Sequence, residues 1–502
     1  MKVLTAAQMR EVDRLTIERG IPGLILMENA GSRVVEFLAR KFAPIASHRI
    51  VVICGKGNNG GDGLAVARQL HIRFHPRALH VVLVADPAGL RGEAADNFRM
   101  LTACGCPFSR QVTTDMRLAT LVIDGLLGTG VKGPATGVVL ESIREINTGF
   151  PLAKIVAVDI PSGMPSDSGA AVGEFVRADY TVTFTAPKVS QALPPNCDYV
   201  GELHVVPIGS PPELFADVAL SLVEPRQFQE LLAARPRSGH KGDFGHVLVI
   251  GGAHGKAGAA AMAGLAALRA GAGLVTVACS DSNLTAVTPT LMTAPLPDSQ
   301  SVAELAEKKD VIAIGPGLGA DPTLASLTRS LFAESDKPMV VDADGLNALA
   351  GQFPNLSNTG RLRVLTPHPG EMSRLTGKSV AAIQADRVGT AGSFATDRKV
   401  VLVLKGQRTL IAFPDGRVWI NPTGTPAMGT GGTGDILTGV ISGFLGQFPK
   451  QPELAISAAV YLHGLSGELG AAAKGEKSLI ATDLLDFLPA AIQACANISD
   501  EI

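Results

Sequence analysis

The residues best suited to chemistry lie near residue 430. Residues 429–435 read GTGGTGD and are followed by the apolar run ILTGV. The N–H groups of such a loop can surround phosphate oxygens, and a helix behind it adds its positive dipole end. Asp435 stands where that helix would begin, so its carboxylate can take a proton from a substrate hydroxyl during phosphoryl transfer. Since so many glycines are costly in an ordinary capped turn, we predict a phosphate-handling site with Asp435 as base.

A second glycine-rich segment lies in the first half of the chain. Residues 55–63 read GKGNNGGDG, directly after an apolar run that ends at Cys54, and we expect a helix from Leu64. Glycines between a strand and a helix let the backbone approach a phosphate closely. No Gly-Lys-Ser/Thr sequence follows, so this is not a Walker loop. An ordinary turn is the alternative, but two asparagines and an aspartate favour a ligand site.

Polar groups also follow two other apolar runs. Asp124 is followed by GLLGTG, and Asp159 is followed by IPSG, which contains Ser162. In an open parallel sheet, the carboxyl ends of the strands border the ligand crevice, so these residues are expected to converge with Asn58 and Asn59. Carboxylate, amide and hydroxyl oxygens together suit a hard cation. Either aspartate taken singly can also be a helix N-cap.

The elements that would position these groups alternate between apolar runs and helix-like stretches. The runs are continuous in Val, Ile and Leu rather than alternating, which is typical of parallel strands buried on both faces. A capping box at Thr5–Gln8 predicts a helix before the first strand. In the first half, strands are predicted at residues 49–54, 79–86, 121–128, 154–161, 180–186 and 203–208.

The same alternation restarts after a Gly/Pro-bearing stretch. A domain boundary is therefore expected between about residues 211 and 240, with domains at 1–215 and 225–498. Two fused α/β domains are the simplest account. In the second half, strands are predicted at residues 246–250, 274–278, 311–314, 339–342, 364–366, 400–404, 409–413 and 418–420.

Composition excludes several classes of protein. The net charge is −2, whereas a protein that binds mainly nucleic acid or anionic membrane needs a basic excess. Six scattered cysteines are too few for a disulfide scaffold in 502 residues and indicate buried thiols in a reducing compartment. The first residues lack the apolar run of a signal peptide. We therefore expect a cytoplasmic protein, and a homo-oligomer.

Three segments of the first half, NNGGDG, DGLLGTG and VDIPSG, together resemble the NAD(P)H-hydrate epimerase family. The resemblance covers most of residues 1–210. It implies a Rossmann-like domain that interconverts the R and S epimers of hydrated NADH and NADPH. It places K⁺ on Asn59, Asp124 and Ser162, and Asp159 at the reacting ring, where an acid/base must serve the C6 hydroxyl. It implies that the hydrate is held by Asn58, Asn59, Gly60, Gly61, Asp62, Gly128, Thr129, Gly130, Val131, Lys132, Gly133 and Pro134.

The second half resembles the ADP-dependent NAD(P)H-hydrate dehydratases of the ribokinase-like superfamily. The resemblance covers about residues 235–495 and is carried by the glycine cluster with TPHPGE, KGQRT, NPTG, IGPGLG and VDADG. It implies that ADP phosphorylates the hydroxyl of the S-hydrate, that phosphate leaves, and that NAD(P)H and AMP result. It implies Mg²⁺, Asp435 as base and substrate contact, and the hydrate along Ala259, Gly317 and His368. The nucleotide residues would be Lys405, Gly406, Gln407, Arg408, Thr409 and Gly434.

Two alternative functions stay open at this stage. A ribokinase-like kinase of a small hydroxymethyl substrate would use the same glycine loop and Asp435. The first half would then be a non-catalytic binding module. His368 by itself would be read as a core or loop histidine, and only its place between two prolines suggests a role. Product analysis separates the readings, because a kinase leaves a stable phosphoester.

Overall fold

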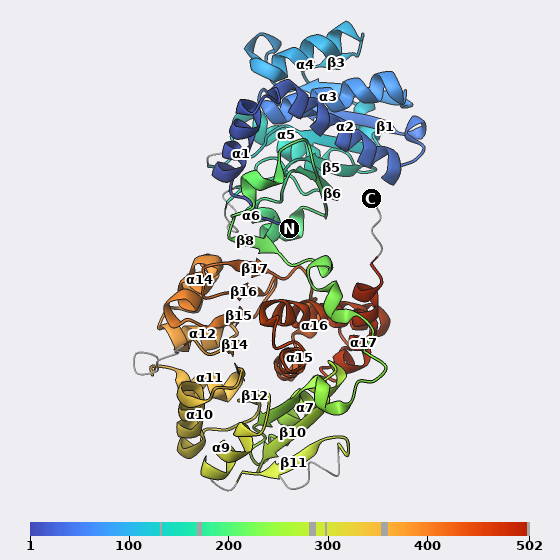
Figure 1. Ribbon diagram of the computed structural model, residues 1–502. Coiled ribbons are helices and arrows are strands. Elements are labelled where there is room, and N and C mark those ends of the chain that lie inside the picture. Colours follow the sequence, from blue (N-terminus) through green and yellow to red (C-terminus); the bar gives the residue numbers. More distant parts are fainter. Residues whose placement is uncertain (131–132, 168–172, 281–287, 297–298, 353–359, 499–502) are drawn as a thin grey trace. The chain divides into compact units, whose positions relative to one another are not determined.

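The computed structural model describes residues 1–130, 133–167, 173–280, 288–296, 299–352 and 360–498 (Figure 1). The chain divides into two compact units, Met1–Val218 and Ala219–Ile502. Each unit has its own sheet with helices on it, so the predicted α/β class is confirmed.

The first unit is built on a seven-stranded sheet in the order β3-β2-β1-β4-β5-β6-β7. Every pairing in it is parallel, as the continuous apolar runs predicted. The strands are β1 (Arg49–Cys54), β2 (Ala78–Leu83), β3 (Phe108–Ser109), β4 (Leu121–Gly125), β5 (Lys154–Val158), β6 (Tyr180–Phe184) and β7 (Glu202–Val206). The helices are α1 (Ala6–Glu18), α2 (Gly23–Lys41), α3 (Asn58–Arg73), α4 (Gly92–Ala103), α5 (Gly137–Thr148) and α6 (Val189–Ala192).

Both faces of this sheet are covered. Side chains alternate along a strand, and in β1 Val52 belongs to one buried cluster while its neighbour Val51 belongs to another. The first cluster includes Leu64 of α3, and the second includes Ile143 of α5. The result is the three-layer arrangement that a Rossmann-like domain requires.

The strand order reverses at β1, which has β2 on one side and β4 on the other. In open α/β sheets this point leaves a crevice at the carboxyl ends of the strands. The loops that leave β1 and β4 meet there, because the amide of Gly55 donates to the carbonyl of Gly125 at 3.1 Å. The predicted polar strand ends are therefore brought to one edge.

The second unit contains a ten-stranded sheet in the order β11-β10-β9-β12-β13-β14-β15-β16-β17-β8. Only the β15–β16 and β16–β17 pairings are antiparallel among its described ladders. The strands are β8 (Leu220–Leu222), β9 (His246–Ile250), β10 (Leu274–Cys279), β11 (Met292–Pro295), β12 (Val311–Ile314), β13 (Met339–Val341), β14 (Arg363–Leu365), β15 (Val401–Leu404), β16 (Leu410–Ala412) and β17 (Val418–Ile420). The helices are α7 (Ala257–Arg269), α9 (Ser299–Glu307), α10 (Pro322–Glu334), α11 (Ala343–Leu349), α12 (Pro369–Thr376), α13 (Val380–Ala385), α14 (Arg387–Arg398), α15 (Thr433–Gln447), α16 (Pro452–Lys474) and α17 (Asp483–Ala496).

Glycines fix the position of α15 against α7. A Cβ at Gly439 would lie 2.1 Å from the carbonyl oxygen of Ala263, and one at Gly443 would lie 2.7 Å from that of Ala267. The two glycines are one helical turn apart, so they form a strip on which the backbone of α7 rests. This close packing sets where the first turn of α15, and Asp435 with it, meets the sheet edge.

All fourteen predicted strands are present; four match the predicted ends and the others differ by up to three residues. The structure adds β3, β8 and β11, which the sequence did not predict. These three are short, lie at the ends of the sheet orders and carry no continuous apolar run, since β11 is largely exposed. The predicted capping box of α1 is also confirmed, with Thr5 and Gln8 as partners.

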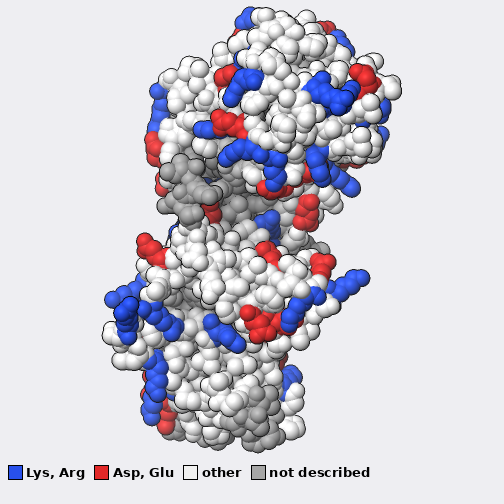
Figure 2. Space-filling view, turned by 90° about the vertical axis from the view of Figure 1, so that its right-hand side faces the viewer, with Lys and Arg blue, Asp and Glu red and all other residues white. Residues whose placement is uncertain are grey.

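The surface agrees with the balanced composition. On the face shown in Figure 2, Lys and Arg side chains are interspersed with Asp and Glu. None of the helices in the described part of the chain combines the length and hydropathy that a membrane span requires.

Candidate active sites

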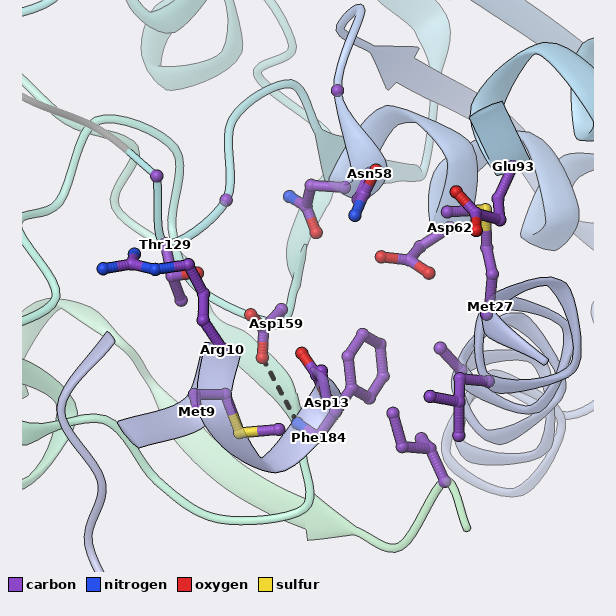
Figure 3. A pocket seen from close by; sticks show the side chains of 18 of the residues that line it. Met9, Arg10, Asp13, Met27, Asn58, Asp62, Glu93, Thr129, Asp159 and Phe184 are labelled. Carbon is purple, nitrogen blue, oxygen red and sulfur yellow. Dashed lines mark hydrogen bonds between the residues drawn. The ribbon is translucent and has the colours of Figure 1, made fainter. Parts of the chain in front are cut away.

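A cavity of about 490 Å³ opens at the carboxyl edge of the first sheet (Figure 3). It lies at the switch point between β1 and β4. Seven of the predicted hydrate-binding residues line it, namely Asn58, Asn59, Asp62, Gly128, Thr129, Gly130 and Asp159. Gly60, Gly61, Gly133 and Pro134 lie outside this lining, and Val131 and Lys132 lie outside the described residues.

The helix after β1 starts earlier than predicted. It begins at Asn58 rather than Leu64, so the glycines of NNGGDG form its first turns instead of a loop. They are needed for close packing: a Cβ at Gly60 would lie 2.0 Å from the Gly55 carbonyl oxygen, and one at Gly61 would lie 2.5 Å from the sulfur of Met27. The early start places the N-terminal amides of α3 at the cavity, where they suit an anionic group.

Asp159 sits in the cavity wall in a strained conformation. Its φ is +62°, which a non-glycine residue adopts only when its surroundings impose it. Those surroundings are hydrogen bonds: Gln191 donates to the Asp159 carbonyl at 2.6 Å, and Thr183 donates to its carboxylate at 3.1 Å. The carboxylate also pairs with the ammonium of Lys188, whose side chain is almost fully buried.

Two residues of this site, Lys188 and Asp13, were not predicted from the sequence. Lys188 follows β6 in the segment FTAPK, so its place after a strand end was an available signal. Asp13 lies on α1, next to Met9 and Val12 on the buried face of that helix. A carboxylate on an otherwise apolar helix face is such a signal too.

Three carboxylates face the same space in Figure 3, those of Asp13, Asp62 and Asp159. Burial raises the pKa of Asp13 to about 6, and the charge of Asp159 adds to the effect. Burial, followed by the charges of Asp159 and Asp13, raises the pKa of Asp62 well above its ordinary range. Carboxyl groups with pKa values near neutrality are suited to proton transfer.

The predicted cation ligands also meet at this edge. The buried carboxylate of Asp124 accepts hydrogen bonds from the Ser162 amide at 2.8 Å and the Ser162 hydroxyl at 2.5 Å. Asn59 donates its amide to the carbonyl of Leu127 at 2.8 Å, and Ser162 accepts from the Leu127 amide at 2.8 Å. The side-chain oxygen of Asn59 is buried, and no hydrogen-bond partner for it occurs within the described ranges. A buried oxygen with no partner among the described residues, on a side chain linked through Leu127 to the Ser162–Asp124 pair, fits a bound cation.

The second site forms around the first turn of α15. Gly432 is the N-cap with φ +100°, and a Cβ there would lie 2.6 Å from Met262, so only glycine fits. No side chain caps this helix, which leaves its first amides to face a ligand. Asp435 stands in this first turn. Burial, together with the charge of Asp342 and against that of Lys405, raises its pKa to about 6.

A buried ion pair lies beside Asp435. The Lys405 ammonium is 2.7 Å from Asp342 and 3.8 Å from Glu371, both buried carboxylates that follow or lie near strand ends. Thr438, one turn after Asp435, donates its hydroxyl to Asp342 at 2.8 Å. A Cβ at Gly434 would lie 3.2 Å from the Lys405 ammonium. The structure thus brings together Lys405, Gly434 and Asp435, all named from the sequence, and adds Asp342 and Glu371.

Ala259 and Gly317 are neighbours at the same sheet edge. A Cβ at Gly317, whose φ is +60°, would lie 3.2 Å from the Ala259 methyl group. Asp344 lies close by, since it accepts from the Gly319 amide at 2.9 Å, and its charge contributes to the raised pKa of Asp435. These contacts place both predicted hydrate-binding positions around one acidic region.

His368 is the N-cap of α12 and is about half exposed. Its Nδ1 accepts from the Gly370 amide at 3.0 Å, and its Nε2 lies 3.5 Å from Glu371. The histidine therefore has a capping role whether or not it touches a ligand.

The other predicted nucleotide residues form the turn between β15 and β16. In it, Gly406 has φ +140° and Arg408 has φ +55°. Thr409 donates its hydroxyl to the Gly406 carbonyl at 3.0 Å, and Arg408 donates to the Pro422 carbonyl at 3.1 Å. Gln407 contributes its carbonyl to the Arg387 guanidinium at 2.5 Å. These bonds give the backbone between Lys405 and Thr409 a fixed shape.

His463 is buried in α16 beneath the glycine cluster and was not singled out from the sequence. Its Nε2 donates to the Thr433 carbonyl at 2.9 Å, in the first turn of α15. Burial lowers the pKa of His463 to about 4, and the nearby Lys405 charge acts in the same direction. A neutral imidazole therefore supports the first turn of α15.

Comparison with known proteins agrees with this division of the molecule. Residues 23–190 match the family model described as YjeF-related protein N-terminus, and residues 247–490 match that of NAD(P)H-hydrate dehydratase. A ribokinase-like superfamily protein from Enterococcus faecalis is 30% identical, with a TM-score of 0.50, over 56% of this chain and 98% of its own. This likeness confirms the ribokinase-like fold of the second unit.

Full-length relatives are found as well. The bifunctional NAD(P)H-hydrate repair enzyme of Moorella thermoacetica is 42% identical over 100% of this chain and 98% of its own length. The enzyme of the same name from Thermofilum pendens is 36% identical over 98% of this chain and 97% of its own length. The chain belongs to the family of bifunctional NAD(P)H-hydrate repair enzymes.

Proposed function

We propose that the two units divide the repair of hydrated NADH and NADPH between them. Residues 1–215 epimerise the R- and S-hydrates, and residues 225–498 dehydrate the S-hydrate with ADP to give NAD(P)H, AMP and phosphate. Family membership supports this pair of activities over a kinase joined to a binding module. The observation that carries the proposal is Asp435 in the uncapped first turn of α15, with a pKa raised to about 6.

In the second unit, Asp435 takes the proton of the C6 hydroxyl while the hydroxyl oxygen attacks the terminal phosphoryl group of ADP. AMP is the leaving group. The C6–O bond then breaks with the help of the ring nitrogen, so that the hydroxyl oxygen departs within phosphate, and loss of a proton from C5 restores the reduced nicotinamide. A base with a pKa near 6 is charged at neutral pH and still accepts a proton readily.

The nucleotide is assigned to the residues around this carboxylate. Gly434 and Lys405, with Gly406, Gln407, Arg408 and Thr409, would hold the phosphates. The ammonium of Lys405 and the first amides of α15 support this role, because both favour negative charge. Ala259, Gly317 and His368 would lie along the hydrate, as the contact between the first two supports.

The donor set of the second unit fits Mg²⁺ held largely by phosphate oxygens. No group of three or more His, Cys, Asp or Glu side chains within the described ranges is arranged to enclose a metal. Mg²⁺ is commonly bound by one or two carboxylates together with substrate phosphates, and Asp342 and Asp344 would supply such carboxylates. When bound, the ion would neutralise charge on the transferred phosphoryl group.

In the first unit, Asp159 would act on the C6 hydroxyl of the bound hydrate. Protonation of that hydroxyl lets water leave with help from the ring nitrogen, and water can return to either face of the ring. The lining by Asn58, Asn59, Asp62, Gly128, Thr129 and Gly130 supports binding of the dinucleotide there. Gly60, Gly61, Val131, Lys132, Gly133 and Pro134 stay proposed contacts of the same ligand.

Asn59, Asp124 and Ser162 would hold K⁺ in this unit. The unpaired side-chain oxygen of Asn59 supports the assignment. The ion would offset the charge of Asp124, whose pKa burial raises to about 6, and would attract the phosphates of the hydrate.

The test is product analysis with the purified full chain and mixed-epimer NADH hydrate, supplied with ADP, with ATP or without nucleotide. We expect recovery of reduced nicotinamide from both epimers with ADP, together with AMP and inorganic phosphate. Recovery of the S-hydrate alone would remove the epimerase assignment. A stable phosphoester instead of inorganic phosphate would replace the dehydratase with a kinase. The same experiment compares ADP with ATP as the donor.

We also propose a cytoplasmic location, supported by six free cysteines of which five are buried. A homo-oligomer stays a prediction, and light scattering of the purified chain tests it.

A further inference from the structure

We propose that Asp13 is a second proton-transfer residue of the epimerase site, acting together with Asp159 on the same bound hydrate. The inference rests on the proposed epimerase function of the first unit. It concerns a residue of α1, outside the strand ends that supply the other groups of the site.

Asp13 lines the cavity. Met9 and Val12, its neighbours on the buried face of α1, are 6% and 3% exposed, so Asp13 is placed on an apolar helix face. Its Oδ1 is buried, and no hydrogen-bond partner for it exists within the described part of the chain. Figure 3 shows this carboxyl group beside Asp159 and Phe184. A buried, unpaired carboxyl oxygen is costly, so its presence points to use with a ligand.

The chain holds α1 against the groups with which Asp13 would work. Leu4 forms a bridge with Lys188, and its amide donates to the Pro187 carbonyl at 2.9 Å. The amide of Ala6, the first residue of α1, donates to Asp167 at 2.6 Å. Lys188, which pairs with Asp159, therefore also bridges to the segment that leads into α1.

Asp13 and Asp159 differ in the charges around them, which indicates which of the two carries the proton. Asp159 pairs with the Lys188 ammonium, whereas no ion pair is found for Asp13 in the described structure. Asp13 is thus the member suited to carry a proton, in agreement with the rise of its pKa to about 6 on burial. The other charged groups that line the cavity are Arg10 on α1, Lys56 before α3, Asp62 on α3 and Glu93 on α4.

The step balances with the groups present. Asp13 gives its proton to the C6 hydroxyl, the C6–O bond breaks, and the nitrogen lone pair forms the C6–N double bond as water leaves. A water molecule then adds to the opposite face of C6, the nitrogen recovers its lone pair, and Asp159 takes the proton lost by that water. Proton exchange with solvent resets the pair, and the opposite assignment runs the reverse reaction.

The experiment measures conversion of pure R-hydrate to S-hydrate without nucleotide, by chiral chromatography, in the full-length chain. Asp13→Asn is nearly isosteric and removes an unpaired buried carboxyl, so its thermal midpoint should not fall. We expect kcat to decrease by about 100-fold or more with little change in KM. The matched control is Glu11→Gln, which alters an exposed side chain of the same helix.

Two further readouts separate proton transfer from a structural role. The wild-type rate should decline as the pH rises above about 6, and Asp13→Asn should lose this limb of the profile. Formate should restore part of the variant's rate by replacing the missing carboxyl group. If Asp13→Asn has the same rate and pH profile as the Glu11→Gln control, the proposal is wrong. Loss of rate with a lower thermal midpoint and no rescue by formate also overturns it.

Failure of the proposed function itself is distinguishable. If the wild-type chain does not convert R-hydrate, the epimerase assignment is wrong. If the wild type is active, Asp159→Asn is inactive and Asp13→Asn has a normal rate, only the role of Asp13 is wrong.

Discussion

The two sites each contain a buried lysine–aspartate pair, but the pairs stand in different relations to the carboxylate proposed to react. In the first unit, Lys188 pairs with Asp159, the carboxylate that faces the cavity. In the second unit, Lys405 pairs with Asp342 at 2.7 Å, and Asp435 on α15 lies beside this pair without belonging to it. Burial and the Asp342 charge then raise the pKa of Asp435 to about 6.

The difference follows the chemistry that each site performs. Epimerisation is its own reverse, so a site that gives and takes protons needs one carboxyl group in each protonation state. Dehydration with ADP runs one way, so a single base beside a phosphate-binding helix end is sufficient. In the proposed mechanisms, Lys188 compensates the charge of the Asp159 carboxylate, whereas Lys405 attracts the phosphates of the nucleotide.

The largest effect is expected at Asp435. Asp435→Asn should lower the dehydratase kcat by about 10³- to 10⁴-fold, because the variant has no base for the C6 hydroxyl. Epimerisation should continue unchanged, since it does not use this carboxylate. Recovery of reduced-nicotinamide absorbance from S-hydrate and ADP measures the first activity, and chiral chromatography measures the second. Asp415→Asn, in an exposed turn, is the control. An unimpaired Asp435→Asn would end the assignment of Asp435 as base.

The two lysines should respond differently to the same substitution. Lys188→Met leaves the carboxylate of Asp159 without its cation, so we expect the epimerase kcat to fall by about 10²- to 10³-fold at a similar KM. Lys405→Met should instead raise the KM for ADP more than it lowers kcat. Steady-state kinetics of both reactions decide this. Equal kcat losses in both variants would show that the two lysines have the same role and would contradict the difference between the sites.

The acid sensitivity of α15 should depend on His463. The folded-state pKa of about 4 lies below the ordinary 6.5, so the unfolded chain binds a proton more readily as the pH falls through this range. Stability from the neutral histidine is therefore complete above pH 6.5 and lost toward pH 4, by up to roughly 3 kcal/mol.

His463→Gln isolates this contribution. The raised pKa of Asp435 acts in the opposite direction, but it is common to both proteins and cancels. Hydrogen exchange of peptides from α15 and α16 at several pH values should show a steeper loss of protection in the wild type. Parallel pH dependence in both proteins would exclude a titrating His463.

The smallest effect concerns K⁺ and should be confined to the first unit. Replacing K⁺ by choline should lower the epimerase rate by about tenfold and reduce protection of α3 from hydrogen exchange, because the ion binds only the folded site. Dehydration of pure S-hydrate should change less. Asn59→Ala should abolish the response of α3 to K⁺, whereas Asn147→Ala, which bonds to the Phe175 carbonyl elsewhere in the unit, should retain it. A K⁺ response that survives in Asn59→Ala would place the ion elsewhere.

The sequence was sufficient for the parts of the molecule that depend on local pattern. Continuous apolar runs predicted fourteen strands, because a strand buried on both faces has no polar position. A glycine cluster directly after a strand indicated Asn58, because the carboxyl ends of parallel strands border the ligand crevice. A glycine cluster in front of an apolar helix indicated Asp435, because the amides at a helix N-terminus favour phosphate. The start of α3 was placed six residues late, since glycines that permit close packing inside a helix look like loop residues in a sequence.

What the sequence determined by itself is the set of groups that must lie at the carboxyl edge of each sheet, since strand direction alone fixes that edge. Only the tertiary structure decided their electrostatic partners. Lys188, Asp13, Asp342 and His463 reach the sites from elements distant in the chain, and the strength of a charge interaction depends on burial and separation in space.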